Sequence, residues 1–425
     1  MATALPPDPF TFLKSLYETA VASVQADVCL APHLPSPPTG RLIVVGAGKA
    51  AAAMAAVVEE CYPHRLEGLV IVPDGYSAKI ENPRVTVIEA SHPVPDVRGE
   101  AAAAKILSLV QSAGPSDMVL ALISGGASAL MALPAPGVTL DDKRAITAAL
   151  LRSGADITQI NCVRKHLSAI KGGHLAAAAA PAPVFNLIIS DVIGDDPAVV
   201  ASGPCVPDPT TCADALAVLD KYSVAVPTAI RTALTAGDFE TPKENDGDVT
   251  TRIIARPSDA LAAAAAAARR EGLAVLNLGD RLDGDARAGA AAQAALVRAV
   301  QAGTGPVQAP CVILSGGEYV VTVKGAGRGG PNTEFALALA AELEGSAGVW
   351  GLAADTDGRD GAAGAAGALI GPDTLRRVRT AGWDIRAVLA GNDSAGVFAS
   401  LGDLLDPGPT YTNVNDFRAI LVGPA

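Results

Sequence analysis

The stretch LIVVGAGKA, residues 42–50, is the clearest indication of fold class in this chain. Its first four residues form a short, fully apolar run, which predicts a β-strand buried on both faces. A glycine turn follows, and after it comes an alanine-rich segment of helical character. Strand, glycine turn and helix in this order are how a parallel α/β sheet presents a ligand site at the carboxyl end of a strand. The stretch therefore predicts a parallel α/β domain.

The same order recurs through the first half of the chain, where further apolar runs end in turns of glycine, serine or aspartate. The runs with their turns are LVIV-PDG (69–75), MVLALI-SGGAS (118–128) and LII-SD (187–191). An amphipathic helix is expected over residues 10–24, where apolar side chains recur at helical spacing. We therefore predict an N-terminal Rossmann-like α/β domain with a doubly wound parallel sheet over residues 1–245.

The polar, acidic segment 236–251 predicts a boundary between two domains. After it, apolar runs at 253–254, 274–278 and 311–315 alternate with a helix expected over 258–270, with Ser258 as its N-cap and Gly272 as its stop. The last run leads into a second Ser-Gly-Gly turn. These features predict a smaller C-terminal α/β domain over residues 250–425, facing the first across a cleft.

Composition limits the partners of the protein. The chain carries 44 acidic and 32 basic residues, a formal net charge of -12 that repels nucleic acid and anionic membranes. No stretch approaches the roughly 20 apolar residues of a membrane-spanning helix, and the N-terminus has no secretory signal. We therefore expect a soluble cytoplasmic protein. The six scattered cysteines form no CxxC pair, so neither a zinc site nor a disulfide framework is predicted.

Two turns carry candidate ligand-binding groups. Gly46-x-Gly48-x-x-Ala51 fits a dinucleotide fingerprint, with Asp74 near the place of a ribose-binding acid, whereas Lys49 in the same turn suits a phosphate or carboxylate. The turn Ser124–Ser128 offers hydroxyls and glycine N–H groups that a polyphosphate can approach closely. A serine-hydrolase triad is disfavoured, because no histidine follows position 174.

Charged segments supply the other candidates. The segment 161–174 is the most basic in the chain, with Arg164, Lys165, His166 and Lys171 expected on one helix, where an anionic substrate would need them. The carboxylate clusters 190–197 and 355–361 suit Mg²⁺ bound partly through phosphates. The segment 325–334 is a glycine loop expected to approach a ligand closely, and it opens a helix from about Asn332.

Taken together, these motifs resemble the glycerate 2-kinase family, whose members carry a C-terminal MOFRL domain and are in part labelled hydroxypyruvate reductases. The resemblance covers nearly the whole chain and is specific as an ordered set. Its motifs are GAGKA (46–50), SHPVPD (91–96), SGGASAL (124–130), NCVRKHLSAIKGG (161–173), SDVIGDDP (190–197), SGPCVPDP (202–209), SGGE (315–318), GRGGPNTEFAL (327–337), DTDGRDG (355–361) and TNVNDF (412–417).

The resemblance implies ATP- and Mg²⁺-dependent phosphorylation of (R)-glycerate at its 2-hydroxyl, in a cleft between two α/β domains, with the MOFRL region at about 308–420. In that family the lysine of GAGKA is an active-site residue, which corresponds to Lys49. This sequence departs at Pro331, where many members have arginine, and at Tyr411, which replaces a frequent glycine. Arg328 is the candidate to substitute for the missing arginine.

Phosphoryl transfer needs positioning and charge neutralisation, which assigns the following roles. Lys49, Asp191 and Arg328 are the expected catalytic residues, with Asp191 and Asp357 as metal ligands and Arg164 and Lys171 holding the glycerate carboxylate. The nucleotide is expected on Gly46, Gly48, Ser124, Gly125, Gly126, Ser128, Ser315, Gly316, Gly317, Glu318 and Asn332.

Two alternatives stay open on the sequence. An NAD(P)H-dependent hydroxypyruvate reductase would use the GxGxxA turn and Asp74. A non-catalytic module that senses a sugar or phosphate would bind its ligand without turnover. The expected partners are the small-molecule substrate and a nucleotide, with no nucleic acid and no membrane, and homodimer formation is left open.

Overall fold

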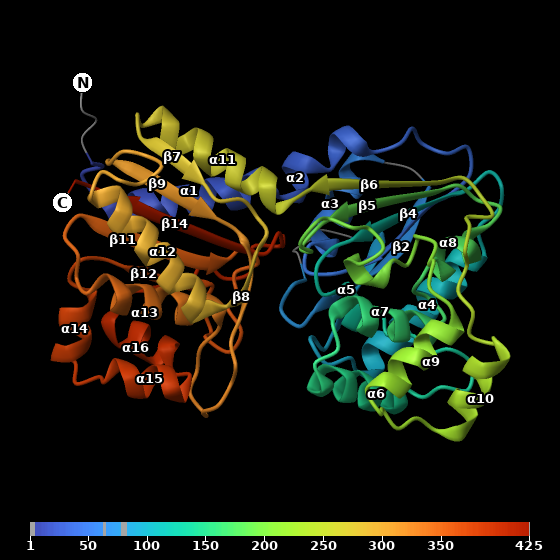
Figure 1. Ribbon diagram of the computed structural model, residues 1–425. Helices are drawn as coiled ribbons and strands as arrows, with labels where there is room; N and C mark the ends of the chain where they lie inside the picture. Colours follow the sequence, from blue (N-terminus) through green and yellow to red (C-terminus); the bar gives the residue numbers. More distant parts are fainter. Residues whose placement is uncertain (1–4, 63–64, 78–82, 425) are drawn as a thin grey trace. The chain divides into compact units, whose positions relative to one another are not determined.

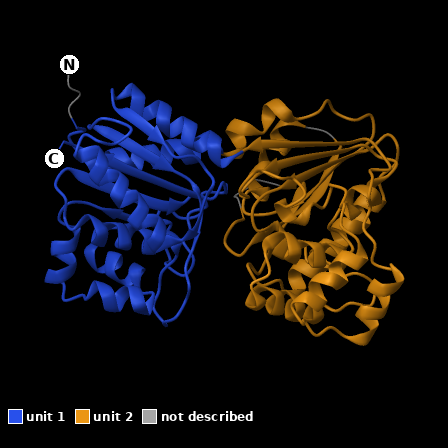
Figure 2. Ribbon diagram, viewed as in Figure 1, with its two compact units in different colours: residues 1–24, 256–425 blue, residues 25–255 orange. Residues whose placement is uncertain are grey.

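The computed structural model describes residues 5–62, 65–77 and 83–424, and its elements are labelled in Figure 1. The chain divides into two compact units, drawn in different colours in Figure 2. Unit 1 comprises Met1–Val24 and Arg256–Ala425, and unit 2 comprises Gln25–Ala255. Each unit has its own sheet and its own hydrophobic core.

Unit 2 is built on a six-stranded sheet in the order β3-β2-β1-β4-β5-β6, with every neighbouring pair parallel. The strands are β1 (Leu42–Ala47), β2 (Leu66–Pro73), β3 (Val85–Ala90), β4 (Met118–Ile123), β5 (Val184–Ile189) and β6 (Val249–Ala255). This strand order is that of a Rossmann sheet, which confirms the predicted doubly wound parallel fold. The order reverses between β1 and β4, and that switch point is where such sheets bind ligands.

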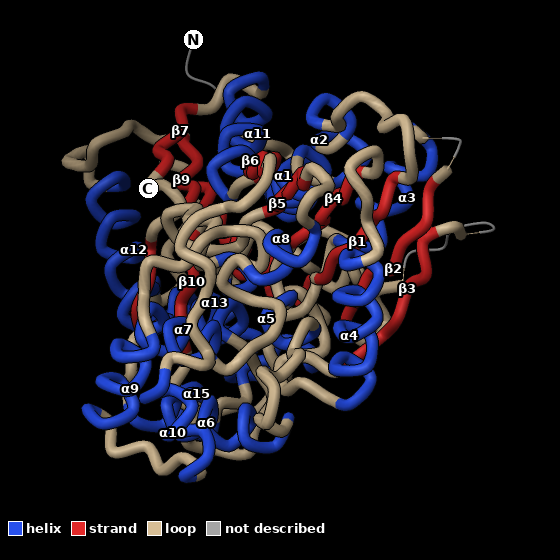
Figure 3. The backbone as a smooth tube through the Cα atoms, turned by 90° about the vertical axis from the view of Figure 1, so that its right-hand side faces the viewer, coloured by secondary structure: helices blue, strands red, loops and turns tan. Residues whose placement is uncertain are grey.

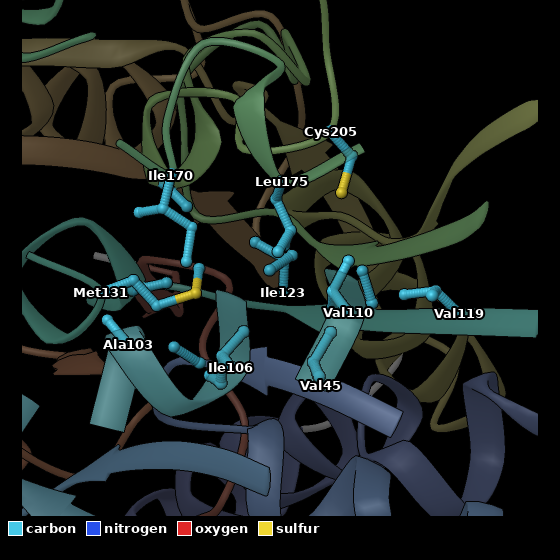
Figure 4. Close-up of a cluster of buried hydrophobic side chains, with 14 of the residues drawn as sticks. Val45, Ala103, Ile106, Val110, Val119, Ile123, Met131, Ile170, Leu175 and Cys205 are labelled. Carbon is cyan, nitrogen blue, oxygen red and sulfur yellow. The ribbon is translucent and has the colours of Figure 1, made fainter. Parts of the chain in front are cut away.

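Helices cover both faces of this sheet (Figures 1 and 3). The helices of unit 2 are α2 (Ala26–Cys29), α3 (Ala51–Cys61), α4 (Val97–Gln111), α5 (Ala127–Leu130), α6 (Leu140–Ser153), α7 (Ile157–His166), α8 (His174–Ala179), α9 (Cys212–Lys221) and α10 (Thr228–Ala236), with 3₁₀ turns at Ala31–His33 and Val200–Ser202. Alternate residues of β1 point into the core that α4 and α8 close, as Val45, Ile106, Val110 and Leu175 show in Figure 4.

Unit 1 has a mixed six-stranded sheet in the order β13-β12-β11-β14-β9-β7, in which only β7 and β9 are parallel neighbours. Its strands are β7 (Ala274–Asn277), β9 (Cys311–Ser315), β11 (Val349–Asp355), β12 (Gly367–Ile370), β13 (Leu404–Leu405) and β14 (Asp416–Val422), and β8 (Leu282–Asp285) pairs with β10 (Gly317–Val320). The helices are α1 (Pro9–Ser23), α11 (Pro257–Arg270), α12 (Ala286–Gln301), α13 (Pro331–Leu343), α14 (Thr374–Thr380), α15 (Ile385–Gly391) and α16 (Ser394–Leu401). Of these, α1 and α11 pack on one face and α12 and α13 on the other (Figure 1).

The division of the chain differs from the predicted boundary at 245–250. Strand β6, expected in the second domain, pairs with β5 and completes the sheet of unit 2. Helix α1, expected in the first domain, packs on α11 and β14 of unit 1. Local sequence patterns fix neither assignment, because only the tertiary structure decides which sheet a strand or helix joins. The predicted N-cap Ser258 is wrong by two positions, since Arg256 occupies the cap and Pro257 the first turn.

Among the residues that the structure describes, no helix has the length and apolar character needed to span a bilayer.

Candidate active site

The turns after β1 and β4 lock together at the switch point of unit 2. The Lys49 N–H donates to the Gly125 carbonyl at 2.9 Å, and the Ala50 N–H donates to the Ser124 hydroxyl at 3.0 Å. A side chain at Gly48 would collide with Ser124, its Cβ lying 2.2 Å from the hydroxyl oxygen. Gly46 lies equally close to β4. Gly48 thus allows the two turns to touch each other, and Gly46 allows close packing of the strands that precede them.

These contacts leave the β1 turn poorly suited to a dinucleotide. The N–H groups of Gly48, Lys49 and Ala50 all donate to protein acceptors, whereas a dinucleotide fingerprint needs its N–H groups for the pyrophosphate. Asp74, expected near a ribose, accepts a two-point ion pair from Arg98 at 2.7 and 2.9 Å. The side chain of Lys49, half-buried in the same turn, is the group of this turn best suited to an anion.

The β4 turn is arranged differently. Within the described part of the chain, the N–H groups of Gly125 and Gly126 donate to no acceptor. Gly126 caps α5 in a left-handed conformation with a φ of +85°, which glycine adopts without strain, and its carbonyl accepts from the N–H groups of Ala129 and Leu130. Consecutive N–H groups in such a turn form a concave site for an anion. Asp191, half-buried, lies in the turn after β5, the strand next to β4, so its carboxylate belongs to the same edge of the sheet.

A pocket of about 400 Å³ begins at Gly126 and Ser128, and we call it the cationic pocket. Its walls are mainly apolar, and four lysine and arginine side chains line it together with His92. The lining residues are His92, Pro93, Val94, Pro95, Gly126, Ser128, Ala129, Ala132, Lys143, Arg144, Thr147, Ala148, Leu151, Arg164 and Lys171. The SHPVPD, SGGAS and NCVRKHLSAIKGG motifs, far apart in sequence, thus meet at one cavity.

Three of these cations are held without a counter-ion. Lys143 and Lys171 are 7% and 2% exposed, and each donates only to a backbone carbonyl, of Leu167 at 2.7 Å and of Ala201 at 3.4 Å. Neither they nor Arg164 forms an ion pair within the described residues. Burial and the charge of Arg164 lower the pKa of Lys143 to about 7, although the Glu100 carboxylate acts in the opposite direction. Burial, with Lys143 and Arg164 nearby, lowers the pKa of Lys171 well below its usual value. An anion entering the pocket would relieve this repulsion.

Arg144, the fourth cation, is already engaged. It donates to the Pro95 carbonyl at 2.8 Å and to Asp141 at 2.7 Å. It therefore shapes the rim of the pocket, while Lys143, Arg164 and Lys171 supply its uncompensated charge.

A strained loop positions Lys171. Ala201, Ser202 and Gly203 all have positive φ, between 56° and 61°, which is costly for the two residues with side chains. The Ala201 carbonyl accepts from Lys171, and the Ser202 hydroxyl lies 3.0 Å from that of Ser128. Backbone strain stored against a pocket-lining lysine and serine is typical of a functional site.

The prediction of one helix carrying the whole basic segment is wrong. Helix α7 ends at His166, and the Ser168 hydroxyl accepts from the N–H groups of Ile170 and Lys171, closing a turn. This turn brings Lys171 back toward Arg164. Lys165 faces away from the pocket and pairs with the buried Asp208 at 3.3 Å.

In unit 1, Asn332, predicted to bind the nucleotide, and Asp360, from the carboxylate cluster 355–361, form a buried polar network with Asp416 and Arg418. Asp360 accepts from the N–H groups of Asn332 and Thr333 at 2.9 and 2.8 Å, and so occupies the N-terminus of α13. The Asn332 amide donates to Asp416 at 2.7 Å. Arg418 pairs with Asp416 at 2.5 Å and donates to the Gly316 carbonyl at 2.9 Å. The Arg418 guanidinium stacks 4.0 Å from the Tyr319 ring centre.

The glycine loop of unit 1 packs against its own chain. A side chain at Gly330 would lie 2.3 Å from an oxygen of Asp360, and the Arg328 N–H donates to Asp393 at 3.0 Å. These glycines were expected to let a ligand approach the backbone. In the structure they allow other segments of unit 1 to pack against the loop. Pro331, the departure from the family pattern, occupies the first turn of α13, where proline costs no hydrogen bond.

The remaining unit 1 candidates lie in different settings. Arg328 is exposed, and its side chain pairs with no described residue. Glu318 is exposed on β10, and Ser315 is 1% exposed with its hydroxyl accepting from Gln293 at 3.1 Å. Asp357 is 1% exposed and accepts from the Arg359 N–H at 2.6 Å.

Three basic residues of the pocket, His92, Lys143 and Arg144, were not singled out in the sequence analysis. Lys143 lies on α6 in an ordinary amphipathic pattern, so nothing in its neighbourhood marks it as unusual. His92 lies inside the SHPVPD motif, and its ring stands 3.2 Å from the position of a Cβ at Gly126. The motif itself could have drawn attention to His92, whereas only the folded chain identifies Lys143.

Family comparisons divide the chain in a similar way. Residues 12–235 match a family described as "Domain of unknown function (DUF4147)", and residues 311–416 match the MOFRL family. The first of these spans most of unit 2, and the second contains much of the buried polar network of unit 1.

Individual relatives cover nearly the whole chain. An Agrobacterium vitis protein named "Putative hydroxypyruvate reductase" is 51% identical over 97% of this chain and 94% of its own length. The Thermotoga maritima D-glycerate 2-kinase is 38% identical over 96% of this chain and 98% of its own. A crystal structure of glycerate kinase from Thermotoga maritima aligns with a TM-score of 0.88 at 37% identity, covering 98% of this chain and all of that one.

Proposed function

Because the chain belongs to the glycerate kinase family that joins a DUF4147 domain to a MOFRL domain, we propose that it is a glycerate 2-kinase. The reaction transfers the terminal phosphoryl group of ATP to the 2-hydroxyl of (R)-glycerate and gives 2-phosphoglycerate. The observation that carries the proposal is the cationic pocket, in which Lys143, Arg164 and Lys171 lack counter-ions beside the N–H groups of the β4 turn.

The charge of the pocket matches the reactants. Glycerate has a carboxylate, and the product has a phosphate as well. Both molecules can therefore supply the counter-ion that the three cations do not have within the protein. Arg164 and Lys171 are the proposed carboxylate ligands, since Arg presents a planar fork and Lys a compact charge. The apolar walls exclude water, which strengthens each of these interactions.

The phosphates are assigned to the switch point. We propose that Lys49 neutralises the transferring phosphoryl group while the Gly125, Gly126 and Ser128 groups hold the ATP phosphates. Asp191 offers the oxygen chemistry that Mg²⁺ requires, and bound Mg²⁺ would neutralise phosphate charge. Asp191 is also the proposed acceptor of the 2-hydroxyl proton. Arg328 in unit 1 stays a predicted catalytic cation, and Asp357 a second predicted metal ligand.

The reductase name carried by a close relative defines the competing hypothesis. The engaged N–H groups of the β1 turn and the ion pair of Asp74 with Arg98 argue against a nicotinamide dinucleotide there. No residue arrangement described above favours hydride transfer.

Two assays on one purified sample test the proposal. The first follows ADP release from Mg-ATP with (R)-glycerate, and the second follows NADH or NADPH oxidation with hydroxypyruvate. Glycerate-dependent ADP release with 2-phosphoglycerate as product is the expected result, and it should be lost in Lys49→Met with the fold retained. Reductase turnover without ADP release would overturn the proposal. Thermal stabilisation by glycerate without any turnover would indicate a binding module instead.

A further inference from the structure

A second group of side chains able to bind a metal comes from α7, from α9 and from the segment after α10, helices that lie together in unit 2 (Figure 1). His166 is the last residue of α7, Cys212 is the first of α9, and Glu240 follows α10. One ligand atom from each, a ring nitrogen, the sulfur and a carboxylate oxygen, lies within 4.8 Å of the other two. The sequence analysis predicted no such site, because these residues are scattered along the chain.

The ring of His166 has a nitrogen lone pair available for a metal ion. Its Nδ1 lies 2.9 Å from the Cys162 carbonyl, which can only accept, so Nδ1 carries the proton. The lone pair of a neutral imidazole is then on Nε2. This nitrogen is buried, lacks a hydrogen-bond partner in the described structure, and lies 3.5 Å from a Glu240 oxygen. Metal-binding histidines typically donate their other N–H to a carbonyl in this way.

From this geometry we propose that His166, Cys212 and Glu240 bind one transition-metal ion of the zinc type. A nitrogen, a thiolate and a carboxylate are the donors that Zn²⁺ takes, with water completing the tetrahedron. The Cys212 proton leaves to solvent when the Zn–S bond forms. The ion ties the end of α7, two residues after Arg164, to α9 and to the segment after α10. The proposal is independent of the kinase activity.

One cation competes for the same site. Lys243 lies 2.5 Å from a Glu240 oxygen and donates to the Thr241 hydroxyl at 2.9 Å. Its side chain is 38% exposed, so it can turn into solvent when a metal arrives. This competition allows two tests with opposite expected results. Removal of the Lys243 charge should strengthen metal binding, whereas loss of a metal ligand should weaken it.

The experiment titrates the chelator-treated full-length protein with Co²⁺, which gives a thiolate-to-cobalt absorption band when a cysteine ligates it. We expect one equivalent to bind, the band to vanish in Cys212→Ala, and Zn²⁺ to displace the Co²⁺. The control is Cys61→Ala, which removes an exposed cysteine outside the site and should leave the band unchanged. A missing band, or a band that persists in Cys212→Ala, would overturn the proposal.

If Cys212→Ala fails to fold, two variants at partly exposed positions still test the proposed metal site. Glu240→Gln should weaken Co²⁺ binding by at least the roughly 10-fold that loss of an outer ligand partner costs. Lys243→Gln should strengthen it. Equal Co²⁺ affinities in wild type and both variants would mean that His166 and Glu240 form only a hydrogen-bonded pair, and the proposal would be wrong. A rise in Tm with Zn²⁺ but not with Mg²⁺ would add support through a readout separate from activity.

Discussion

The cationic pocket of unit 2 and the buried polar network of unit 1 are both built from glycine turns beside charged residues. The two differ in whether these charges are paired with opposite charges of the protein. In unit 1, Arg418 finds Asp416, and Asp360 finds the first N–H groups of α13. In unit 2, Lys143, Arg164 and Lys171 face one another around a cavity. Charges that satisfy each other stabilise a fold. Charges left uncompensated around a cavity prepare it for a ligand.

The largest expected difference is in stability. Arg418→Met leaves Asp416 buried without its cation, and breaking such a pair costs about 3–5 kcal/mol of unfolding free energy. Lys171→Met removes one of three mutually repelling cations, so the free energy of unfolding should stay unchanged or rise. Urea unfolding of both variants measures this contrast. A Lys171→Met protein as unstable as Arg418→Met would break the comparison.

Within unit 2, two neighbours on α7 separate ligand binding from folding. Arg164→Met should lower kcat/KM for glycerate about 100-fold, equivalent to about 2.7 kcal/mol, because a charged hydrogen bond to substrate is lost. Lys165→Met should leave KM near wild type but destabilise the fold, since Asp208 loses its partner in the interior. Steady-state kinetics with unfolding curves test the pair, and the reverse pattern would contradict the assignment of Arg164.

Titration of Lys143 sharpens the comparison next. Burial lowers its pKa to about 7 from the usual 10.5, so between these values the unfolded chain holds a proton that the folded chain lacks. Stability should therefore rise with pH across this window, by at most about 1.4 kcal/mol per pH unit. Lys143→Met should flatten the slope between pH 8 and 9, whereas the exposed Lys105→Met should not. Identical slopes in wild type and Lys143→Met would contradict the burial argument.

The smallest effect concerns backbone strain. Ala201→Gly near the pocket and Glu344→Gly at the end of α13 both place glycine where φ is positive, 56° and 51°. Each should gain about 0.5–1 kcal/mol of stability. Only Ala201→Gly should raise KM for glycerate, because a glycine backbone holds the carbonyl that accepts from Lys171 less rigidly. A raised KM in both variants, or in neither, would contradict the hypothesis that the strained backbone at Ala201 positions Lys171 for substrate binding.

The sequence alone indicated the parallel α/β class of unit 2 and the family, although it left out β3 and assigned β6 to the other domain. Buried parallel strands read as unbroken apolar runs, so β1 and β4 could be located directly, and β4 was predicted over its observed span. The motifs that carry the resemblance lie within short segments, which is why they identify the family without a structure. Lys49, Asp191 and the other assigned site residues stay predictions that the variants above test.

Tertiary structure decided the partner of each charge. Sequence places Arg164, Lys165 and Lys171 in one basic run, but the turn at Ser168 and the buried Asp208 divide them between pocket and fold. It likewise gives no sign that Lys143 lines the cavity or that His166, Cys212 and Glu240 converge. The physical reason is that a charge is compensated by whatever lies within a few ångströms. In a folded chain those neighbours come from segments far apart in sequence.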